Sequence, residues 1–100
     1  MKNFLDTPQV VVMGASTGGL DALQTVLETL PGNFPGAFLV VQHRKAAAED
    51  LLSRLLRRIC PLPVLEAKDK TQIYTGHVYV APADYHLLVE RDKRLSLSID

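Results

Sequence analysis

The sequence predicts an α/β fold of the doubly wound type, built on a mostly parallel sheet. The first observation behind this prediction is that short, continuous runs of apolar and β-branched residues alternate with amphipathic segments of helical spacing. The second is the order of these segments over the first two thirds of the chain. That order is strand, helix, strand, helix, strand, which favours right-handed crossovers. The third is that 47% of the 100 residues are hydrophobic, which is enough for the core of one domain.

The first strand and the first helix flank a glycine-rich turn. Residues 10–13 are a continuous apolar run, typical of a strand covered on both faces. A helix is expected after this turn, and Pro31-Gly32 ends it. Asp21 lies in the first turn of the helix, where a negative charge suits the helix dipole. The apolar residues that recur at helical spacing are Leu20, Leu23, Val26, Leu27 and Leu30.

A second strand of the buried type is expected at residues 37–41, and it closes at Gln42-His43. The next helix is expected over residues 46–60, where Pro61 and Pro63 stop it and a third strand follows. The apolar face of this helix consists of Ala48, Leu51, Leu52, Leu55, Leu56 and Ile59. Its solvated face carries the basic group Arg54, Arg57 and Arg58.

The pattern changes after Asp69. Residues 73–80, 86–90 and 95–99 are expected to form short antiparallel strands, with turns near Pro82-Ala83-Asp84 and Asp92-Lys93. The expected architecture is therefore Rossmann-like with three layers, and it carries an antiparallel hairpin region after residue 70.

Composition and charge narrow the function classes. The sequence has 11 basic and 11 acidic side chains, which argues against nonspecific binding to nucleic acid because that binding relies on a basic surface. No segment has the features of a secretory signal or the length of a membrane span. The single cysteine, Cys60, rules out an internal disulfide and fits a reducing compartment, so a cytoplasmic protein without membrane insertion is expected. The three histidines and one cysteine show no metal-ligand spacing, so no metal or cofactor is expected.

The candidate chemistry lies in the turn Gly14-Ala15-Ser16-Thr17-Gly18-Gly19. Ligands collect outside the carboxyl ends of parallel strands. Ser16 follows the first strand and His43 follows the second, so both are expected at that edge. Neighbouring strands run about 4.8 Å apart. A serine and a histidine at adjacent strand ends can therefore come within hydrogen-bond reach, the arrangement that activates a serine nucleophile.

Other interpretations of the same residues stay open. Ser16 or Thr17 can serve as a helix N-cap, and His43 as a structural residue at the end of a strand. A glycine-rich turn before a helix can also hold a phosphate on its free amides. However, the turn has no lysine as in a P-loop, and its glycine spacing does not match a dinucleotide fingerprint. A phosphate- or nucleotide-binding module and an inactive remnant are therefore the alternatives to an enzyme.

Three further residues are most simply interpreted as structural. His77 is expected at an exposed strand position, because the residues around it alternate. His86 lies beside a turn, where it is either a plain turn residue or a group that reaches a cleft. Cys60 ends an amphipathic helix and is expected to pack partly buried.

Three motifs carry a family resemblance: the serine turn, Val40-Val41-Gln42-His43, and Gly76-His77-Val78-Tyr79-Val80-Ala81-Pro82. With these motifs the chain resembles the catalytic domain of chemotaxis protein-glutamate methylesterases over almost its whole length. The resemblance implies hydrolysis of glutamate γ-methyl esters on the cytoplasmic helices of chemoreceptors, with release of methanol, and deamidation of receptor glutamines by some members. It implies that Ser16 is the nucleophile and His43 the general base. It also implies that Thr17 and His86 are substrate-side contacts.

The sequence departs from the pattern of that family. The triad aspartate and a backbone donor of the oxyanion hole come from a Gly-x-Gly-x-Asp-Gly type segment, which is absent. Arg44-Lys45 stand where the family has Met-Pro, glycines expected near Lys70 and Ala83 are missing, and no receiver domain precedes the catalytic part. Residues 1–9 are interpreted as an N-terminal extension and residues 10–100 as the N-terminal part of a methylesterase-like catalytic domain. Such an incomplete domain is expected to be impaired by itself and to leave a sheet edge exposed, which self-association or a partner would cover.

Overall fold

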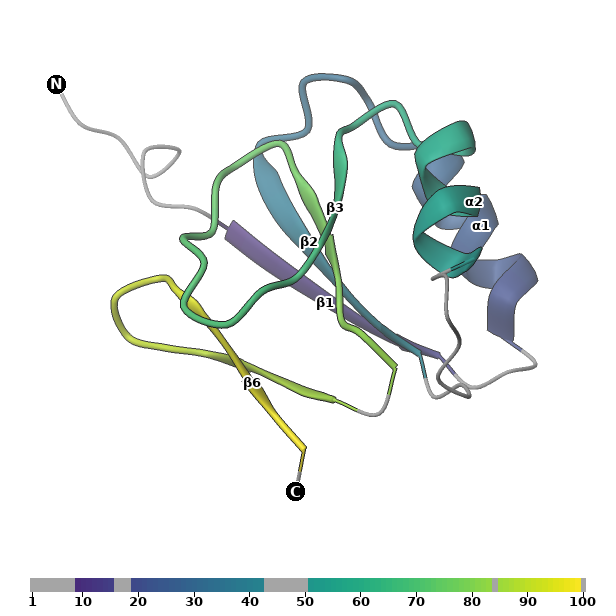
Figure 1. Ribbon diagram of the computed structural model, residues 1–100. Coiled ribbons are helices and arrows are strands. Elements are labelled where there is room, and N and C mark those ends of the chain that lie inside the picture. Colours follow the sequence, from purple (N-terminus) through teal and green to yellow (C-terminus); the bar gives the residue numbers. More distant parts are fainter. Residues whose placement is uncertain (1–8, 16–18, 43–50, 84, 100) are drawn as a thin grey trace, which may run out of the picture.

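A computed structural model describes residues 9–15, 19–42, 51–83 and 85–99 (Figure 1). Along the chain the elements are β1 (Gln9–Ala15), α1 (Leu20–Glu28), β2 (Gly36–Gln42), α2 (Leu51–Ile59), β3 (Val64–Glu66), β4 (Val78–Val80), β5 (His86–Val89) and β6 (Leu95–Ser98). Neither of the helices in this described part has the length and apolar character needed to cross a membrane.

Within the described residues the main sheet has four strands in the order β1-β2-β4-β3, and every neighbouring pair is parallel. β1 and β2 pair along their full length, from Gln9↔Gly36 to Ala15↔Gln42. A helix lies between β1 and β2 in the sequence, and another between β2 and β3, as crossovers between parallel strands require. The predicted α/β class with a mostly parallel sheet is therefore confirmed.

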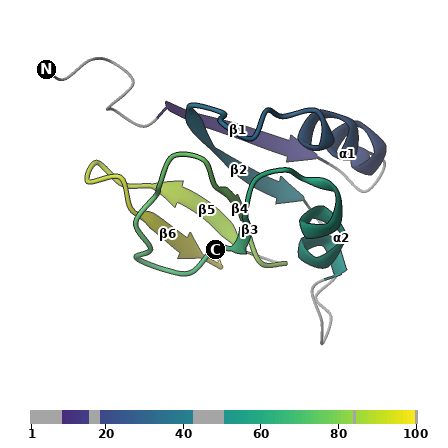
Figure 2. The same cartoon turned by 90° about the horizontal axis from the view of Figure 1, so that it is seen from above.

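The molecule has three layers, because α1 and α2 cover one face of the main sheet and the β5–β6 hairpin covers the other (Figure 1, Figure 2). The buried cluster on the helix side includes Leu23, Leu27, Phe38, Val40, Leu52 and Leu56. The cluster on the hairpin side consists of Ala37, Leu39, Ala67, Ile73, Tyr79 and Leu95. Alternate residues of β2 belong to alternate clusters, so this strand is buried on both faces.

The prediction of an antiparallel strand over residues 73–80 is wrong. Only Val78–Val80 form a strand, and this strand, β4, lies parallel between β2 and β3. The residues before it form a turn in which Gly76 has a φ of 80° and donates its N–H to the carbonyl oxygen of Gly36 at 2.8 Å. All three residues of β4 are buried, as a central strand of a parallel sheet requires. An apolar run of this length does not reveal the direction of its neighbours, which only the tertiary fold sets.

The antiparallel hairpin that follows is confirmed. β5 and β6 pair from His86↔Ser98 to Val89↔Leu95, so each strand ends one residue earlier than expected. The loop that precedes β4 ties the hairpin down. The Leu95 N–H donates to the Thr71 carbonyl at 2.7 Å, and the Lys70 N–H donates to the Leu95 carbonyl at 2.7 Å. β6 is therefore anchored through its backbone at the point where its first side chain enters the core.

The two helices follow the predicted pattern with two differences. α1 ends at Glu28, before the expected stop at Pro31-Gly32. In α2, Leu51 was expected on the apolar face but is 66% exposed. Leu51 and the buried Leu52 are one residue apart, so they point about 100° apart around the helix and cannot share one narrow face. Residues 46–50, also expected to be helical, lie outside the described residues.

The prediction that residues 10–13 form a strand covered on both faces is wrong for the described part of the chain. β1 is the edge strand of the main sheet, with β2 as its neighbour on one side. Its Val12 side chain is 63% exposed and its Val11 side chain is 39% exposed. The apolar run of β1 thus has the composition of an interior strand and the position of an edge strand.

Candidate functional site

The predicted nucleophile and base, Ser16 and His43, lie outside the described residues, as does Thr17. Their immediate neighbours are described. Ala15 ends β1, Gln42 ends β2, and these two residues are register partners in the parallel pair. The condition for bringing the two groups together, that the first two strands are direct neighbours, is therefore met, and both strands end level at the same edge of the sheet.

Level strand ends place Ala15 and Gln42 one strand spacing apart. Paired strands lie about 4.8 Å apart, and each following Cα lies about 3.8 Å beyond the last. Gln42 is buried at this edge, and the residue has an interaction partner, so it is a polar group built into the edge. Gln42 was expected only to close the second strand, as part of the Gln-His motif. Its place two residues after the buried Val40, on the same face of β2, was the signal that it packs inward.

The N-cap position of α1 is Gly19, which has no side chain to offer. The alternative interpretation, that Ser16 or Thr17 is the N-cap of this helix, is therefore not supported. Asp21 lies in the first turn of α1, as predicted, where its negative carboxylate interacts favourably with the positive end of the helix dipole. The same negative charge opposes a bound phosphate at this helix end, which weakens the interpretation of the turn as a phosphate cradle.

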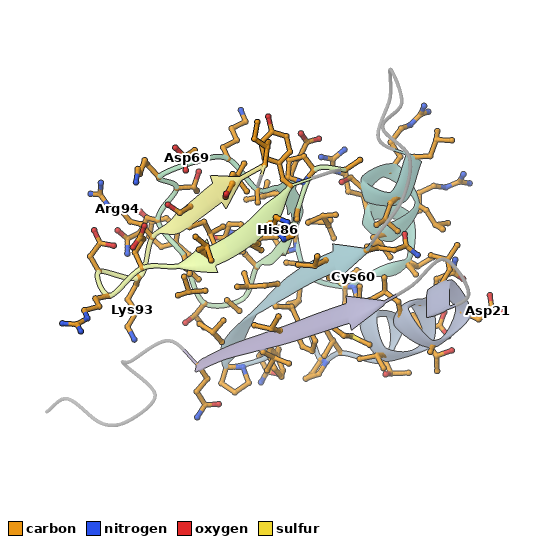
Figure 3. The ribbon with its side chains drawn as sticks, turned by 90° about the horizontal axis from the view of Figure 1, so that it is seen from below. Asp21, Cys60, Asp69, His86, Lys93 and Arg94 are labelled. Atoms are coloured by element: carbon orange, nitrogen blue, oxygen red, sulfur yellow. The ribbon has the colours of Figure 1, made fainter. Side chains whose placement is uncertain are left out.

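His86 is described, and it is the exposed first residue of β5. The loop that leads to it starts at the carboxyl edge of the main sheet, because the Ala81 N–H donates to the Val40 carbonyl at 2.9 Å. The loop then turns, and the Tyr85 N–H donates a hydrogen bond to the Pro82 carbonyl oxygen at 3.3 Å. Figure 3 shows His86 toward the opposite end of the hairpin from Lys93 and Arg94. His86 is thus exposed after a loop that starts at the carboxyl edge of the main sheet, where a substrate could contact it.

His77 was expected at an exposed strand position, and this prediction is wrong. His77 is half-buried and precedes β4, with its Nδ1 atom 3.0 Å from the Thr75 carbonyl oxygen. Its ring stacks on the ring of Tyr79 at a centroid distance of 6.2 Å. Because it lies before the first residue of β4, it is at the amino edge of the sheet, away from the ends of β1 and β2.

Cys60 packs partly buried at the end of α2, as predicted. Burial raises the pKa of its thiol, and a backbone hydrogen bond at Leu62 opposes this shift more weakly. Arg57, predicted on the solvated face, also ties α2 to β3, since its Nε donates to the Val64 carbonyl at 3.0 Å. Within the described ranges, no group of three or more histidine, cysteine, aspartate or glutamate side chains is placed to hold a metal ion.

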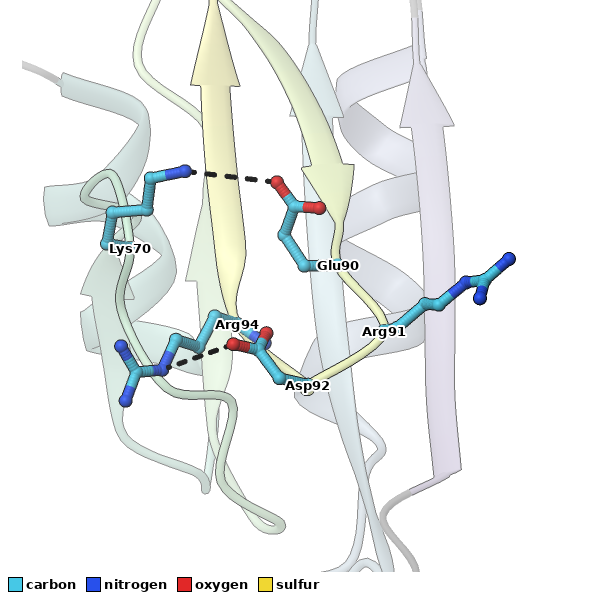
Figure 4. Close-up of a pocket in the computed structure, with 5 residues that line it drawn as sticks. All are labelled: Lys70, Glu90, Arg91, Asp92 and Arg94. Carbon is cyan, nitrogen blue, oxygen red and sulfur yellow. Dashed lines mark hydrogen bonds and ion pairs between the residues drawn. The ribbon is translucent and has the colours of Figure 1, made fainter.

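A hollow that the sequence did not predict lies at the turn end of the hairpin (Figure 4). Its charged side chains largely pair with one another. The Lys70 Nζ lies 3.9 Å from the Glu90 Oε1, and the Arg94 Nε lies 3.7 Å from the Asp92 Oδ2. The Ser96 hydroxyl donates to the same Glu90 oxygen at 2.8 Å. The residues around this hollow form a solvated network of charges on the surface. The network lies at the C-terminal end of β5, away from the loop that follows β4.

The family model of CheB methylesterase matches residues 11–100. The chain belongs to the CheB methylesterase family. A putative protein-glutamate methylesterase/protein-glutamine glutaminase of Leptospira interrogans serogroup Icterohaemorrhagiae serovar copenhageni is 43% identical over 91 residues, which are 91% of this chain and 47% of that protein. The protein-glutamate methylesterase/protein-glutamine glutaminase of Caldanaerobacter subterraneus subsp. tengcongensis is 46% identical over 87% of this chain and 24% of its own length.

A solved CheB structure shares the fold. The crystal structure of the Thermotoga maritima CheB methylesterase catalytic domain matches with a TM-score of 0.82 and 35% identity, over 94% of this chain and 51% of that chain. The present chain thus spans about half the length of the Leptospira relative and of the Thermotoga domain. The resemblance inferred from the three motifs is confirmed, and Ser16, Thr17, His43 and His86 all fall inside the matched region.

Proposed function

We propose that this CheB-family chain supplies the nucleophile and the general base of a protein-glutamate methylesterase. Its substrates are glutamate γ-methyl esters on the cytoplasmic helices of chemoreceptors, and glutamine side chains of the same helices are a second substrate class. The activity is placed in the cytoplasm, in keeping with a single cysteine and the location of those helices. The observation that carries the proposal is the pairing of Ala15 with Gln42, because each of these residues directly precedes a candidate group.

The chemistry assigned to the two residues is that of a serine hydrolase. The Ser16 Oγ attacks the ester carbonyl carbon and forms a C–O bond while His43 accepts the hydroxyl proton. The bond to the methoxy oxygen then breaks, and His43 returns the proton so that methanol leaves. Water attacks the carbonyl carbon of the acyl-serine while His43 accepts a proton from it. The bond between that carbon and the Ser16 Oγ then breaks and His43 returns the proton to Oγ, which frees the glutamate and restores Ser16. With a glutamine substrate the leaving group is ammonia.

Thr17 and His86 are assigned to the substrate side of this edge. Support for His86 comes from its exposure and from the loop that starts at the carboxyl edge and leads to it. Support for Thr17 comes from its place in the serine turn, within the matched region of the family. Neither residue is assigned a proton-transfer role.

The 100-residue chain is expected to turn over slowly by itself. Of its described aspartates, Asp69 accepts a hydrogen bond from the Leu97 N–H at 2.9 Å and Asp92 accepts one from the Arg94 N–H at 3.2 Å, so both stabilise the hairpin. Loss of the orienting carboxylate costs about 10⁴ in turnover in a well-studied triad, and loss of one oxyanion donor costs about 10²–10³. A histidine without its carboxylate still accepts a proton, but in a poorly fixed tautomer and orientation.

Covalent labelling tests the assignment of Ser16 without requiring full turnover. A fluorophosphonate probe is expected to modify the chain slowly and at one site, which peptide mass spectrometry would place at Ser16. Ser16→Ala is expected to abolish labelling, and His43→Gln to slow it at least about tenfold because the general base is lost. Methanol release from a methylated receptor fragment should fall in the same order, from the unsubstituted chain to His43→Gln to Ser16→Ala.

Matched variants distinguish a reactive serine from general surface reactivity. Ser98→Ala changes a partly buried serine of β6, and His77→Gln changes a histidine at the amino edge of the sheet. Both variants are expected to react with the probe at the same rate as the unsubstituted chain. Labelling that persists in Ser16→Ala, or that falls equally in His77→Gln and His43→Gln, contradicts the proposed roles.

A further inference from the structure

The exposed side of α2 concentrates positive charge. Its sequence over Leu51–Ile59 is Leu-Leu-Ser-Arg-Leu-Leu-Arg-Arg-Ile, with three arginines and no acidic residue. The whole chain has 11 basic and 11 acidic side chains, so the rest of the chain is net acidic. Arg54, Arg57 and Arg58 are all exposed. Arg57 and Arg58 lie in the last turn, where a positive charge suits the helix dipole, but Arg54 lies in the middle of the helix. Stabilisation of the helix end therefore does not account for the whole cluster.

Two of these arginines form a stripe with an exposed leucine. Successive residues of an α-helix point about 100° apart, so Leu51, Arg54 and Arg58 fall within about 60° of one another around the helix axis. Leu51 is 66% exposed. Arg57 lies outside this stripe, and its Nε is bonded to the Val64 carbonyl of β3. We call Leu51, Arg54 and Arg58 the α2 stripe. An exposed apolar side chain beside arginines is typical of protein interfaces, in which arginine is enriched.

The α2 stripe begins on the side of the sheet that holds the candidate chemistry. α2 connects β2 to β3, and these strands run in the same direction because both are parallel to β4. The helix must therefore run back from the carboxyl edge of the sheet to the amino edge. Leu51 lies toward the carboxyl edge, where β2 ends at Gln42, and Arg58 lies about 10 Å farther along the helix axis. α2 lies beside α1 on one face of the sheet (Figure 2). A helical partner along the stripe would thus start at the candidate site and extend over α2.

The proposed reaction changes the charge of its partner. Hydrolysis turns a neutral glutamate methyl ester into a carboxylate, and deamidation does the same to a glutamine. A helix with more than one such site therefore gains negative charge as its sites are processed. Arginine suits such a partner, because its planar guanidinium forms paired hydrogen bonds with a carboxylate. Arg54 and Arg58 are about 6 Å apart along the helix axis, and two glutamates four residues apart on a neighbouring helix have the same spacing.

We propose that the α2 stripe docks the acidic face of the substrate helix and binds free glutamate carboxylates that flank the site being hydrolysed. The kind of partner in this inference rests on the proposed function. Arg54 and Arg58 pair with the carboxylates, and Leu51 packs on the apolar part of the same helix. Carboxylates that have already formed on the helix then strengthen its docking. A partly processed helix is therefore bound more tightly than an unprocessed one.

The test measures binding of two defined peptides to the full 100-residue chain. Both are fluorescent, alanine-based helical peptides with one glutamate γ-methyl ester at the centre. One peptide has a pair of glutamates four residues apart on each side of the ester, and the other has glutamines there, which are similar in size but uncharged. Fluorescence anisotropy at low salt is expected to show at least about fivefold tighter binding of the glutamate peptide. This preference should fall below about twofold at about 0.5 M salt, because salt screens exposed charges.

Charge-matched variants locate the preference on α2. The double variant Arg54→Gln/Arg58→Gln is expected to abolish it, and Arg54→Lys/Arg58→Lys to keep part of it, because lysine retains the charge but not the paired hydrogen bonds. Lys68→Gln/Arg91→Gln removes the same charge from exposed residues outside α2, and it should leave the preference unchanged. Arg91 lies in the turn of the hairpin and is directed away from the other side chains drawn there (Figure 4). Circular dichroism checks folding, and Arg58→Gln alone should lower the preference at least about twofold if the double variant does not fold.

Four outcomes would overturn the proposal. They are equal affinity for the two peptides, a preference that survives in the folded Arg54→Gln/Arg58→Gln variant, an equal loss in Lys68→Gln/Arg91→Gln, and equally tight binding of a single-stranded oligonucleotide through the same arginines. The last result would assign the α2 stripe to nucleic acid. Ser16→Ala should bind both peptides as the unsubstituted chain does. Binding with the glutamate preference but without fluorophosphonate labelling would therefore refute the serine chemistry alone, and labelling at Ser16 without the preference would refute the docking alone.

Discussion

At the scale of single residues, Gly36 controls how closely β1 and β2 approach. It begins β2 and is the register partner of Gln9. A Cβ atom at Gly36 would lie 2.7 Å from the Gln9 carbonyl oxygen, a contact with backbone that cannot rotate away. Only glycine therefore allows the two strands to start their pairing at this distance.

Gly36→Ala is expected to lower the free energy of unfolding by about 1–3 kcal/mol, because the strands must separate or shift to relieve the overlap. Gly32→Ala is the matched control, since nothing lies within 4 Å of its added Cβ. It should change stability by less than about 0.5 kcal/mol. Urea unfolding of both variants measures the difference, and equal effects would contradict the importance of the close approach.

Cys60 provides a pH-dependent prediction at the same scale. Burial raises the pKa of its thiol in the folded chain, so the folded state retains the proton at pH values where the unfolded chain has lost it. The stability that this group contributes is complete below the unfolded pKa and is lost as the pH rises through the folded pKa. Modification by a disulfide reagent should be slower in the native chain than in urea between about pH 8 and 10. Cys60→Ser removes the only thiol and measures the background reaction of the reagent. Equal modification rates in the native and the unfolded chain would contradict the raised pKa.

At the scale of elements, the β5–β6 hairpin forms the third layer through a few buried side chains. Leu95 of β6 is fully buried in the cluster on the hairpin side, while Leu88 of β5 is 53% exposed. The two leucines lie in the same hairpin but on opposite faces, since Leu88 pairs with Ser96, the neighbour of Leu95. The stability of the layer therefore depends on one face of the hairpin.

Leu95→Ala is expected to cost about 2–5 kcal/mol, since it removes buried methyl groups and leaves a cavity between hairpin and sheet. Leu88→Ala should cost less than about 1 kcal/mol because its side chain already faces water. Thermal unfolding of both variants checks the contrast. A large loss of stability in Leu88→Ala together with a small loss in Leu95→Ala would contradict this assignment, because it would mean that the opposite face of the hairpin packs on the sheet.

The elements also show where sequence patterns are sufficient. The two helices were predicted because apolar spacing marks one face, and Leu23 and Leu27 of α1 are buried as that spacing requires. The direction of β4 was predicted wrongly, because Val78, Tyr79 and Val80 are apolar whichever way their neighbours run. Exposure of Leu51 was missed because a pattern of leucines does not show how wide the buried face is.

At the scale of the whole molecule, strand order decides where the candidate chemistry lies. β1 and β2 are adjacent, and Ala15 and Gln42 end them level, so the last described residues before Ser16 and His43 are register partners. The mixed charges around Lys70 and Glu90 lie at the turn of the hairpin, apart from that edge. The same strand order leaves β1 at the edge, which is why its valines are exposed. One topology thus explains both the level ends of β1 and β2 and the exposure of the β1 edge.

The sequence by itself determined the fold class, the alternation of strands and helices, and the family, because these depend on local periodicity and on short motifs such as the serine turn. The tertiary structure decided which strands are neighbours, the parallel direction of β4, the burial of Gln42 and the open edge of β1. These properties arise from contacts between residues far apart in the chain. A residue's own neighbours in sequence carry no information about such contacts.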